Sequence, residues 1–272
     1  MNMNETSLPI AGLPFVNGSY RSAGKTPGLL PRLWPSLAFY LREFIIVWQA
    51  SAKAKRGKYD DREWLKGSLD TIRNLERVGV RLEVSGLEHV AALGGPCVFI
   101  GNHMSTLETF ALPGILLPEK RISFVVKQSL LDYPIFGHIM RSRDPISVGR
   151  TNPREDLKAV LEGGVERIKR GVSLVIFPQT TRNVAFDPKE FNTIGVKLAK
   201  RADVPVIPFA VKTDAWGNGR LAKDLGKIDP AKTVHCAFAA PLRIAERGNE
   251  EHEAIIRFIV ARLTAWGGIA KG

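Results

Sequence analysis

A histidine and a carboxylate lie five residues apart in the stretch FIGNHMSTLETF, residues 99–110. His103 follows a short apolar run, and a histidine with a pKa near ~6.5 accepts a proton at neutral pH once its tautomer is fixed. A helix that begins near Ser105 would bring Glu108 back towards the imidazole, where its carboxylate would accept the Nδ1 hydrogen bond. The spacing also fits an acid that only complements the positive end of a helix. The stretch alone leaves both interpretations open.

The hydroxyl groups of Ser105 and Thr106 lie between this histidine and this acid. A nucleophilic serine usually stands in a G-x-S-x-G turn, and no such turn surrounds them. The stretch MSTLE instead has the form of a capping box, in which Ser105 or Thr106 would be the N-cap residue of a helix. We therefore expect these hydroxyls to cap a helix and not to attack a substrate.

A second polar cluster follows the apolar run that ends at Pro178. Its members are Gln179, Thr180, Thr181 and Arg182. An arginine beside hydroxyls and backbone amides, just past a strand, is suited to hold an oxyanion or a phosphate. Taken alone, Arg182 fits an ordinary surface arginine as well.

Taken in order, these stretches and two others resemble the sequence blocks of the glycerolipid acyltransferase family, the PlsC-like lysophospholipid acyltransferases. NHMSTLE matches a first block that begins with Asn-His and ends in aspartate, with Glu108 in place of the aspartate. ISVGR supplies Arg150 of the second block. Before it, VVKQSLLDYPIFG carries Lys127, Pro134 and Gly137 at the family's spacings.

The third block of the family, usually Phe-Pro-Glu-Gly-Thr-Arg, reads FPQTTR here, so that Gln179 and Thr180 replace the acid and the glycine. The block keeps Phe177, Pro178, Thr181 and Arg182. A fourth block, a strand of the Val-Pro-Ile-Val-Pro type, matches VPVIPFA with Pro205 and Pro208. The resemblance extends over residues 80 to about 215.

The resemblance implies transfer of an acyl group from a thioester to the hydroxyl of a lysolipid, with 1-acylglycerol 3-phosphate as the default acceptor, in phospholipid biosynthesis. Acyl carrier protein or coenzyme A would carry the thioester as a co-substrate, and no cofactor or metal is implied. His103 would be the general base, and Glu108 would orient its ring. Arg182, with Arg150 and Lys127, would grip an acidic headgroup.

The third block also raises alternatives, because its acid and glycine belong to the acceptor pocket in the family. Gln179 carries no negative charge, and Thr180 adds a Cβ where glycine permits close approach of the backbone. With Thr181 and Arg182, these residues are the expected substrate-binding residues. Three other functions stay open: an acyltransferase for a different lysolipid, a thioester hydrolase that uses the same histidine, and a non-catalytic membrane-bound relative.

The elements that must position these residues alternate along the chain. The apolar runs VRLEVSG, PCVFIG, ISFVVK, DPISVG, VSLVIFP, VPVIPFAV and TVHCAFAAP predict strands. Helices are predicted over residues 61–77 and 250–266, and between Asn152, the expected N-cap, and Gly171. The alternation predicts an α/β fold, with a layered mixed sheet flanked by helices. His103 would then lie at the carboxyl end of a strand, where open α/β sheets place their sites.

The chain before this domain divides into two parts. Residues 1–30 are rich in Gly, Pro, Ser and Asn and predict a flexible or loosely packed segment. Residues 31–79 predict a two-helix membrane-associating element, ahead of an acyltransferase domain over residues 80–272. The resemblance also implies that the two N-terminal helices form a membrane-seating element.

An apolar stripe in the first of these helices supports that expectation. At helical spacing it contains Leu37, Tyr40, Leu41, Phe44, Ile45 and Trp48. Arg42 and Glu43 interrupt the apolar run, and a span needs roughly 20 apolar residues, so we expect the helix to lie on a membrane without crossing it. A stripe does not say what it packs against. A helix docked on the rest of the protein is the alternative.

The net charge, the absence of certain motifs and the cysteine positions limit the kinds of partner that this chain is expected to bind. The net charge of +12 and the pI of about 9.9 favour polyanions: nucleic acid, anionic lipid or a phosphorylated substrate. No nucleic-acid recognition motif and no Gly-rich nucleotide loop is present. Cys97 and Cys236 lie apart in apolar runs, which indicates neither a zinc site nor a disulfide framework. We expect a peripheral or monotopic protein on the cytoplasmic face of the inner membrane, with anionic lipid at its surface.

Overall fold

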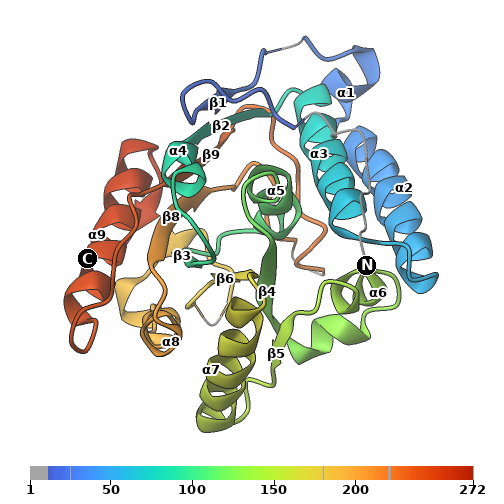
Figure 1. Cartoon of the computed structure of the whole chain (residues 1–272). Coiled ribbons are helices and arrows are strands. Elements are labelled where there is room, and N and C mark those ends of the chain that lie inside the picture. Colours follow the sequence, from blue (N-terminus) through green and yellow to red (C-terminus); the bar gives the residue numbers. More distant parts are fainter. Residues whose placement is uncertain (1–11, 25, 180, 220–221, 272) are drawn as a thin grey trace.

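A mixed sheet of eight strands, flanked by helices, forms the centre of the computed structural model (Figure 1). The structure describes residues 12–24, 26–179, 181–219 and 222–271. The strand order is β1-β2-β9-β8-β3-β6-β4-β5, and a small second sheet pairs β10 with β7. The predicted α/β fold with a mixed sheet is confirmed.

The strands of the described chain are β1 (Tyr20–Arg21), β2 (Arg81–Ser85), β3 (Val98–Gly101), β4 (Ile122–Lys127), β5 (Ile146–Val148), β6 (Ser173–Ile176), β7 (Ala185–Phe186), β8 (Val206–Lys212), β9 (Thr233–Phe238) and β10 (Ile269–Ala270). Seven of them lie close to the apolar runs that predicted them, whereas the two-residue strands β1, β7 and β10 were not predicted. Strands β2 with β9, and neighbouring strands from β8 to β5 in the order above, pair in parallel, whereas β8 with β9 and β1 with β2 pair antiparallel.

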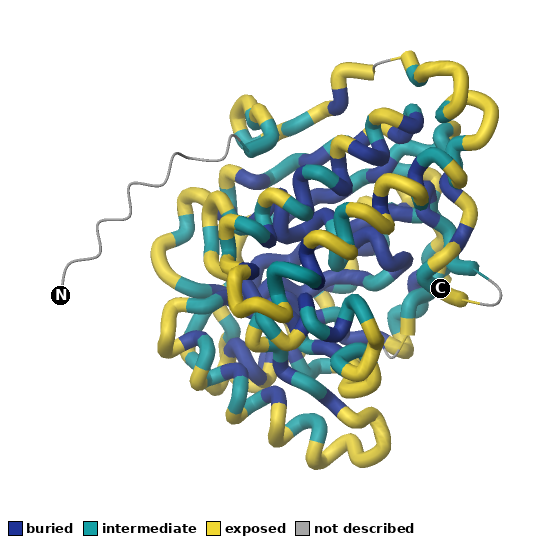
Figure 2. Tube along the Cα trace, turned by 90° about the vertical axis from the view of Figure 1, so that its right-hand side faces the viewer, coloured by how far each residue is buried: buried dark blue, intermediate teal, exposed yellow. Residues whose placement is uncertain are grey.

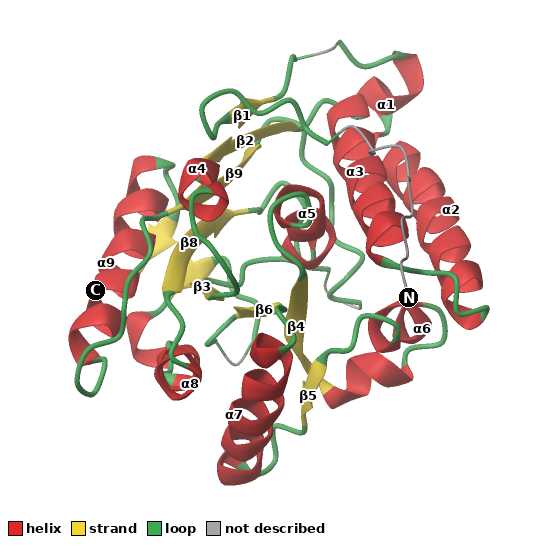
Figure 3. Ribbon diagram, viewed as in Figure 1, coloured by secondary structure: helices red, strands yellow, loops and turns green. Residues whose placement is uncertain are grey.

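Helices cover both faces of this sheet (Figure 3). They are α1 (Leu29–Leu33), α2 (Pro35–Lys55), α3 (Asp61–Arg77), α4 (Leu87–Ala91), α5 (Leu107–Leu116), α6 (Phe136–Arg141), α7 (Pro153–Lys169), α8 (Ile194–Ala202) and α9 (Asn249–Ala265). The expected N-cap of α7 is confirmed, because the Asn152 side chain accepts a hydrogen bond from the backbone N–H of Arg154.

Strand β3 shows how one strand joins two cores. Side chains alternate between the faces of a sheet, so Phe99 belongs to the core that includes α3 and α5, while Val98 and Ile100 belong to the core that includes α7, α8 and α9. All three side chains are almost completely buried. Figure 2 shows the buried residues gathered in the middle of the molecule, inside exposed turns and helix faces. His103 therefore follows a strand that is fixed on both sides.

Helices α2 and α3 pack together beside the sheet, with α2 on the outside (Figure 1). Much of the apolar stripe of α2 faces outward, since Leu41, Phe44 and Trp48 are each more than half exposed. The inward face instead buries Phe39 and Glu43. None of the described helices is both long enough and apolar enough to cross a membrane.

Part of the N-terminal segment is tied to the sheet, in contrast to the loose packing expected for residues 1–30. Strand β1 pairs with β2, and the buried Ser22 hydroxyl donates to Glu76 at 2.6 Å and accepts from the N–H of Leu82 at 2.8 Å. The edge of the sheet supplies backbone partners that composition does not reveal. The first eleven residues lie outside the described chain, and the division of the chain into three segments stays a prediction.

Candidate active site

The candidate site lies at one edge of the sheet, where the parallel strands β3, β6 and β8 end. Directly after β3, the Asn102 amide donates to the carbonyl of Val211 at 2.8 Å and accepts from its N–H at 2.9 Å. Gly101 before it has no room for a Cβ, which would lie 2.5 Å from the ring of Phe209. The Asn of the Asn-His pair therefore joins β3 to β8 and fixes the start of the turn that carries His103.

His103 is held by its backbone and by ring stacking. Its N–H donates to the Gln179 side chain at 2.7 Å, and its carbonyl accepts from the N–H of Asn183 at 3.0 Å. Its ring stacks on Phe177 with the two centroids 4.2 Å apart. The first and third sequence blocks thus meet, and the buried Gln179 supports the histidine from behind.

The imidazole of His103 is neutral at pH 7. Burial lowers its pKa to about 3, and the positive charges of Arg182 and Arg150 act in the same direction. The Nδ1 atom is buried and has no hydrogen-bond partner among the described residues. A neutral imidazole whose side chain is 16% exposed can accept a proton from a group that reaches the site.

Glu108 lies close to this ring, but its oxygens are engaged with the turn. Oε1 accepts from the N–H groups of Met104 and Ser105 at 2.7 and 2.9 Å and from the Thr213 hydroxyl at 2.8 Å. Oε2 lies 3.9 Å from Nδ1 of His103. Burial raises the pKa of the Glu108 carboxyl, and these hydrogen bonds oppose the rise. The two expected partners are neighbours without a direct hydrogen bond.

The capping interactions expected here form around Ser105, one residue before the N-cap Thr106, whose own side chain makes no capping hydrogen bond. The Ser105 hydroxyl oxygen accepts from the N–H of Leu107 at 3.1 Å, while Glu108 accepts from the Ser105 N–H. This reciprocal pair is similar to a capping box, but the serine oxygen bonds the N–H two residues on and not three. The Ser105 hydroxyl is buried and donates to the backbone of Thr213 at 3.1 Å, so it is a structural group. Glu108 both completes the cap and places a carboxylate beside His103.

Arg182 takes part in a compact polar cluster. Its Nη1 donates to Oδ1 of Asp224 at 2.7 Å and also to the Thr106 hydroxyl. The Thr106 hydroxyl donates to the same carboxylate oxygen at 2.9 Å. Thr181 is exposed, and its hydroxyl accepts from Nζ of Lys223 at 3.2 Å. The arginine of the third block therefore faces the start of α5, next to His103.

Arg150 lies two residues beyond the end of β5 in a left-handed backbone conformation, with φ 62°. Non-glycine residues seldom adopt this conformation. The carboxylate of Asp156 holds it by accepting from the N–H groups of Gly149 and Arg150, each at 2.9 Å. Burial lowers the pKa of Arg150, which stays a cation at neutral pH. Its positive charge therefore acts on the His103 ring across the site.

The structure thus brings together His103, Glu108, Gln179 and Arg182, with Arg150 acting through its charge. Lys127 is exposed at the end of β4, where it pairs in register with Val148 of β5, and no hydrogen bond joins it to this group within the described part of the chain. Thr180 lies outside the described residues, so its expected role stays a prediction.

Sequence patterns did not point to the loop that follows β8, yet three of its residues touch the site. Thr213 donates to Glu108, Asp224 pairs with Arg182, and the Asn218 amide donates to the carbonyl of Met104 at 3.0 Å. The sequence KTDAWGNG, which contains the first and last of these groups, has no catalytic motif. The only available signal was their position after a predicted strand whose carboxyl end meets the same edge of the sheet.

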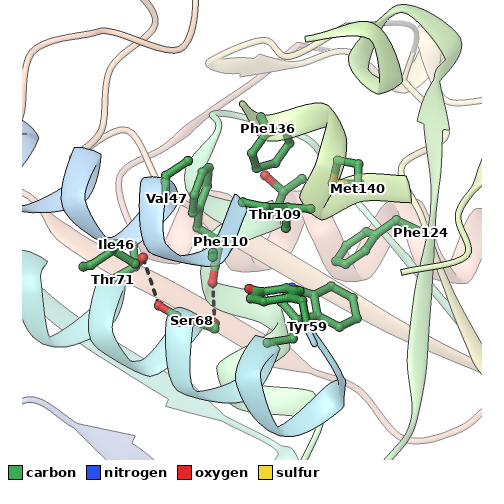
Figure 4. A pocket seen from close by; sticks show the side chains of 14 residues that line it. Ile46, Val47, Tyr59, Ser68, Thr71, Thr109, Phe110, Phe124, Phe136 and Met140 are labelled. Atoms are coloured by element: carbon green, nitrogen blue, oxygen red, sulfur yellow. Dashed lines mark hydrogen bonds between the residues drawn. The ribbon is translucent and has the colours of Figure 1, made fainter. Parts of the chain in front are cut away.

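An apolar cavity of about 40 Å³ lies between α2, α3, α5, α6 and β4 (Figure 4). Phe110, Phe124 and Phe136 line it, together with Met140 and residues of the two N-terminal helices. The ring of Phe124 lies 6.4 Å from that of Phe177, which stacks on His103. A line of aromatic rings thus connects the histidine with the cavity. Among the described residues, no group of acidic, histidine or cysteine side chains is placed to hold a metal ion.

Comparison with known proteins shows to which family the chain that carries this site belongs. The family model described as Acyltransferase matches residues 81–212. A 1-acyl-sn-glycerol-3-phosphate acyltransferase of Pseudomonas aeruginosa is 31% identical over 235 residues, which cover 85% of this chain and 86% of that protein. The chain belongs to the acyltransferase family. All four sequence blocks fall within the matched acyltransferase region, and the recognition made from them is confirmed.

Two further comparisons agree with the acyltransferase assignment. The chloroplastic 1-acyl-sn-glycerol-3-phosphate acyltransferase BAT2 of Brassica napus is 26% identical over 141 residues, or 52% of this chain and 39% of that protein. The crystal structure of the 1-acyl-sn-glycerophosphate acyltransferase of Thermotoga maritima matches with a TM-score of 0.63 at 19% identity, over 85% of this chain and 93% of that one. The second likeness shows that the acyltransferase fold is shared.

Proposed function

We propose that this acyltransferase moves an acyl group from a thioester to the hydroxyl of 1-acylglycerol 3-phosphate. The observation that carries the proposal is the neutral His103 ring beside Arg182 and Arg150 at the carboxyl edge of the sheet. The ring supplies a base, and the two guanidinium groups supply the charge that a phosphate monoester needs. The similarity to the 1-acyl-sn-glycerol-3-phosphate acyltransferase of Pseudomonas aeruginosa supports the same acceptor.

In the proposed reaction, Nε2 of His103 takes the proton of the acceptor hydroxyl as its oxygen attacks the thioester carbonyl carbon. The carbon–sulfur bond then breaks, and the imidazolium returns the proton to the leaving thiolate, so that a thiol and an ester are the products. The Glu108 carboxylate, 3.9 Å from Nδ1, stabilises the charged ring during this step. Nδ1 carries the hydrogen in this assignment because it faces the carboxylate.

The two arginines link acceptor binding to the strength of the base. In the empty site, burial lowers the pKa of His103, and the charges of the two arginines lower it further. A phosphate bound to Arg182 and Arg150 compensates these charges, and the pKa of the ring rises towards its ordinary value. His103 thus becomes a stronger base when an anionic acceptor is in place. This coupling favours transfer to a phosphorylated acceptor over hydrolysis by water, which brings no charge.

We assign the acyl donor to acyl carrier protein or coenzyme A, and the protein to the surface of a membrane, on the cytoplasmic face of the inner membrane. The outward apolar face of α2 and the net charge of +12 support binding to an anionic lipid surface. The aromatic rings between His103 and the cavity support a path for the acyl chain, with its end directed towards Phe110 and Met140.

Purified protein on anionic vesicles, supplied with an acyl thioester and a panel of lysolipids and followed by mass spectrometry, tests the proposal. The wild type should acylate 1-acylglycerol 3-phosphate, and His103→Gln should lose activity by about 100-fold or more, the usual range for a general base. His89→Gln is the matched control: this histidine lies on α4, its side chain is 39% exposed, and the variant should retain full activity. Thermal melting and vesicle binding should be equal in all three proteins.

Each departure from this result overturns a different part of the proposal. Transfer by His103→Gln at the wild-type rate would remove the histidine from its role. Wild-type product formed only with another lysolipid would reject the acceptor. Free fatty acid as the main product would make the protein a hydrolase, and a wild type without any turnover would make it a non-catalytic relative.

A further inference from the structure

The guanidinium of Arg182 is anchored through one of its nitrogens. Asp224 and the Thr106 hydroxyl both accept from Nη1, and these two groups are also hydrogen-bonded to each other. Nε and Nη2 have no hydrogen-bond partner in the part of the chain that the structure describes. A phosphate is recognised best by two parallel N–H groups of one guanidinium. The anchoring therefore leaves the bidentate edge of Arg182 for a ligand.

Asp224 is itself held by a buried tryptophan. The indole N–H of Trp216 donates to the backbone carbonyl of Asp224 at 3.1 Å. Trp216 is only 3% exposed, and its ring packs against Phe39 of α2 with the centroids 4.8 Å apart. Asp224, which anchors Arg182, is thus connected through Trp216 to the inner face of α2.

Two more hydrogen bonds connect α2 to the same loop just beyond Asp224. The Tyr40 hydroxyl donates to the carbonyl of Gly226 at 2.5 Å, and the Ser36 hydroxyl accepts from the N–H of Ile228 at 3.0 Å. Burial raises the pKa of Tyr40 to about 12, so its hydroxyl remains a donor throughout the physiological range. The segment from Asp224 to Ile228 is therefore fastened to the helix whose other side is exposed and apolar.

We propose that Asp224 is a positioning residue for the acceptor, which fixes the phosphate-binding edge of Arg182, and that α2 holds Asp224 in place through Tyr40, Ser36 and Trp216. The inference rests on the proposed function, in which Arg182 binds the phosphate of the acceptor. It adds a physical connection between the helix assigned to the membrane and the residue that recognises the lipid headgroup.

Asp224 has two conceivable roles: it competes with the phosphate for Arg182, or it positions Arg182 for the phosphate. The direction in which acceptor binding changes when Asp224 is replaced distinguishes these roles. If its carboxylate only competed with the phosphate for Arg182, its removal would strengthen binding of the acceptor. If it positions Arg182, its removal leaves a long side chain to be immobilised by the ligand, and binding weakens. Tyr40→Phe tests the same point without any change of charge, because it removes only the hydroxyl that fastens the loop.

The experiment uses anionic vesicles that contain 1-acylglycerol 3-phosphate as the acceptor. It measures the Michaelis constants for acceptor and acyl thioester, and the acceptor Kd in the absence of donor. Asp224→Asn and Tyr40→Phe should each raise the acceptor KM and Kd about three- to tenfold, the range for immobilising one side chain. The donor KM and kcat should change by less than twofold. In the double variant, Tyr40→Phe should add no further effect, because its action passes through Asp224.

Asp144→Asn is the matched control. Asp144 pairs with Arg167, which is about as buried as Arg182, but on the distant α7. This variant should leave every constant unchanged. A lower or unchanged acceptor Kd in Asp224→Asn, equal changes in donor and acceptor constants, or additive effects in the double variant would overturn the proposal. A wild type that binds the acceptor but does not acylate it would reject the proposed function alone, because the Kd comparison does not depend on turnover.

Discussion

At the scale of single residues, the Glu108 carboxylate interacts with two parts of the site: the turn that carries His103 and the imidazole ring itself. The carboxylate accepts from two backbone N–H groups and two hydroxyls, and these contacts fix the turn that carries His103. Its second oxygen lies 3.9 Å from the imidazole. The distance falls within the reach of Coulomb attraction to an imidazolium, which at a buried site is stronger than in water. A carboxylate that holds the turn thus also lies ready for the charge that forms during transfer.

The spacing of residues in the sequence predicted this neighbourhood only in part. His103 and Glu108 are five residues apart, so their proximity follows from one turn of chain. The role of Gln179 as a support for the His103 backbone depends on the pairing of β3 with β6, which brings together residues 76 positions apart. Asp224 is more distant still from Thr106, and no local pattern marks it.

Gln179→Leu should weaken the support of His103. The change keeps the approximate size of the side chain but removes the acceptor of the His103 N–H, and an unpaired buried N–H costs about 1–3 kcal/mol. We expect the free energy of unfolding to fall by about that amount and kcat to fall by about tenfold or more, because a shift of the base by an ångström is costly for proton transfer. Urea unfolding and initial rates of acyl transfer measure the two effects.

Gln179→Glu is the control for that substitution, because a carboxylate oxygen still accepts from the His103 N–H. It should retain kcat better than Gln179→Leu. Equal rates for Gln179→Leu and the wild type would show that the hydrogen bond does not position the histidine.

At the scale of elements, α2 exposes apolar side chains on its outer face and buries a carboxyl group on its inner face. Its outer face carries Leu41, Phe44 and Trp48, while its inner face buries the Glu43 carboxylate, which is 4% exposed. Glu43 accepts from the Thr71 hydroxyl at 2.7 Å and from the Asn74 amide at 3.1 Å, both on α3. Helical periodicity in the sequence predicted the apolar stripe. It did not show which side faces the protein, because that depends on the polar partners that α3 supplies.

Glu43 should make the stability of the protein depend on pH. Burial raises its pKa to about 7 from an ordinary value of 4.5, so between these values the folded protein binds a proton that the unfolded chain has released. The free energy of unfolding that this carboxyl contributes therefore falls as the pH rises, by about 2–3 kcal/mol between pH 5 and pH 7.5. Glu43→Gln should remove that fall, as measured by urea unfolding of both proteins at the two pH values.

A second carboxylate between the same helices provides the comparison. Glu63 of α3 pairs with Lys53 of α2 at 2.5 Å, and its side chain is 29% exposed. Glu63→Gln should leave the Glu43-dependent fall in place. If Glu43→Gln and the wild type showed the same difference between pH 5 and pH 7.5, the buried carboxyl would not be the source of the effect.

At the scale of the whole molecule, most of the large hydrophobic side chains exposed in the described chain belong to α1, α2 and the residue between them. Leu29, Leu33 and Trp34 are exposed, as are Leu41 and Phe44 of α2. Exposed large apolar side chains gathered in one part of the chain indicate a contact with a membrane or a partner. The chain also carries a net charge of +12. These two properties together support the membrane surface that the sequence predicted for this region.

Removing apolar side chains from this face should weaken binding to vesicles. Leu41→Ser and Phe44→Ser should each lower the partition onto anionic vesicles by about tenfold, since burying one such side chain is worth about 1.5–3 kcal/mol and interfacial burial is partial. Sedimentation with vesicles measures the partition. Higher salt should weaken binding further through charge screening, and the effect of each substitution should persist.

Ile269→Ser is the control for these substitutions, because Ile269 is 57% exposed but lies on β10, in the second sheet. It should bind vesicles as the wild type does. Equal binding by Phe44→Ser and the wild type would count against the α2 face as the contact.

The membrane contact that we propose for the outward apolar face of α2 determines which measure of acceptor concentration controls the rate. A protein held at a bilayer in the way we propose meets its lysolipid by diffusion in two dimensions, so the relevant quantity is the mole fraction of acceptor in the surface. Dilution of the acceptor with inert phospholipid then slows the reaction even when the amount in the tube is constant. The thioester, by contrast, arrives from water and obeys its ordinary molar concentration. The rate therefore depends on the surface mole fraction of the lysolipid but on the molar concentration of the thioester in water.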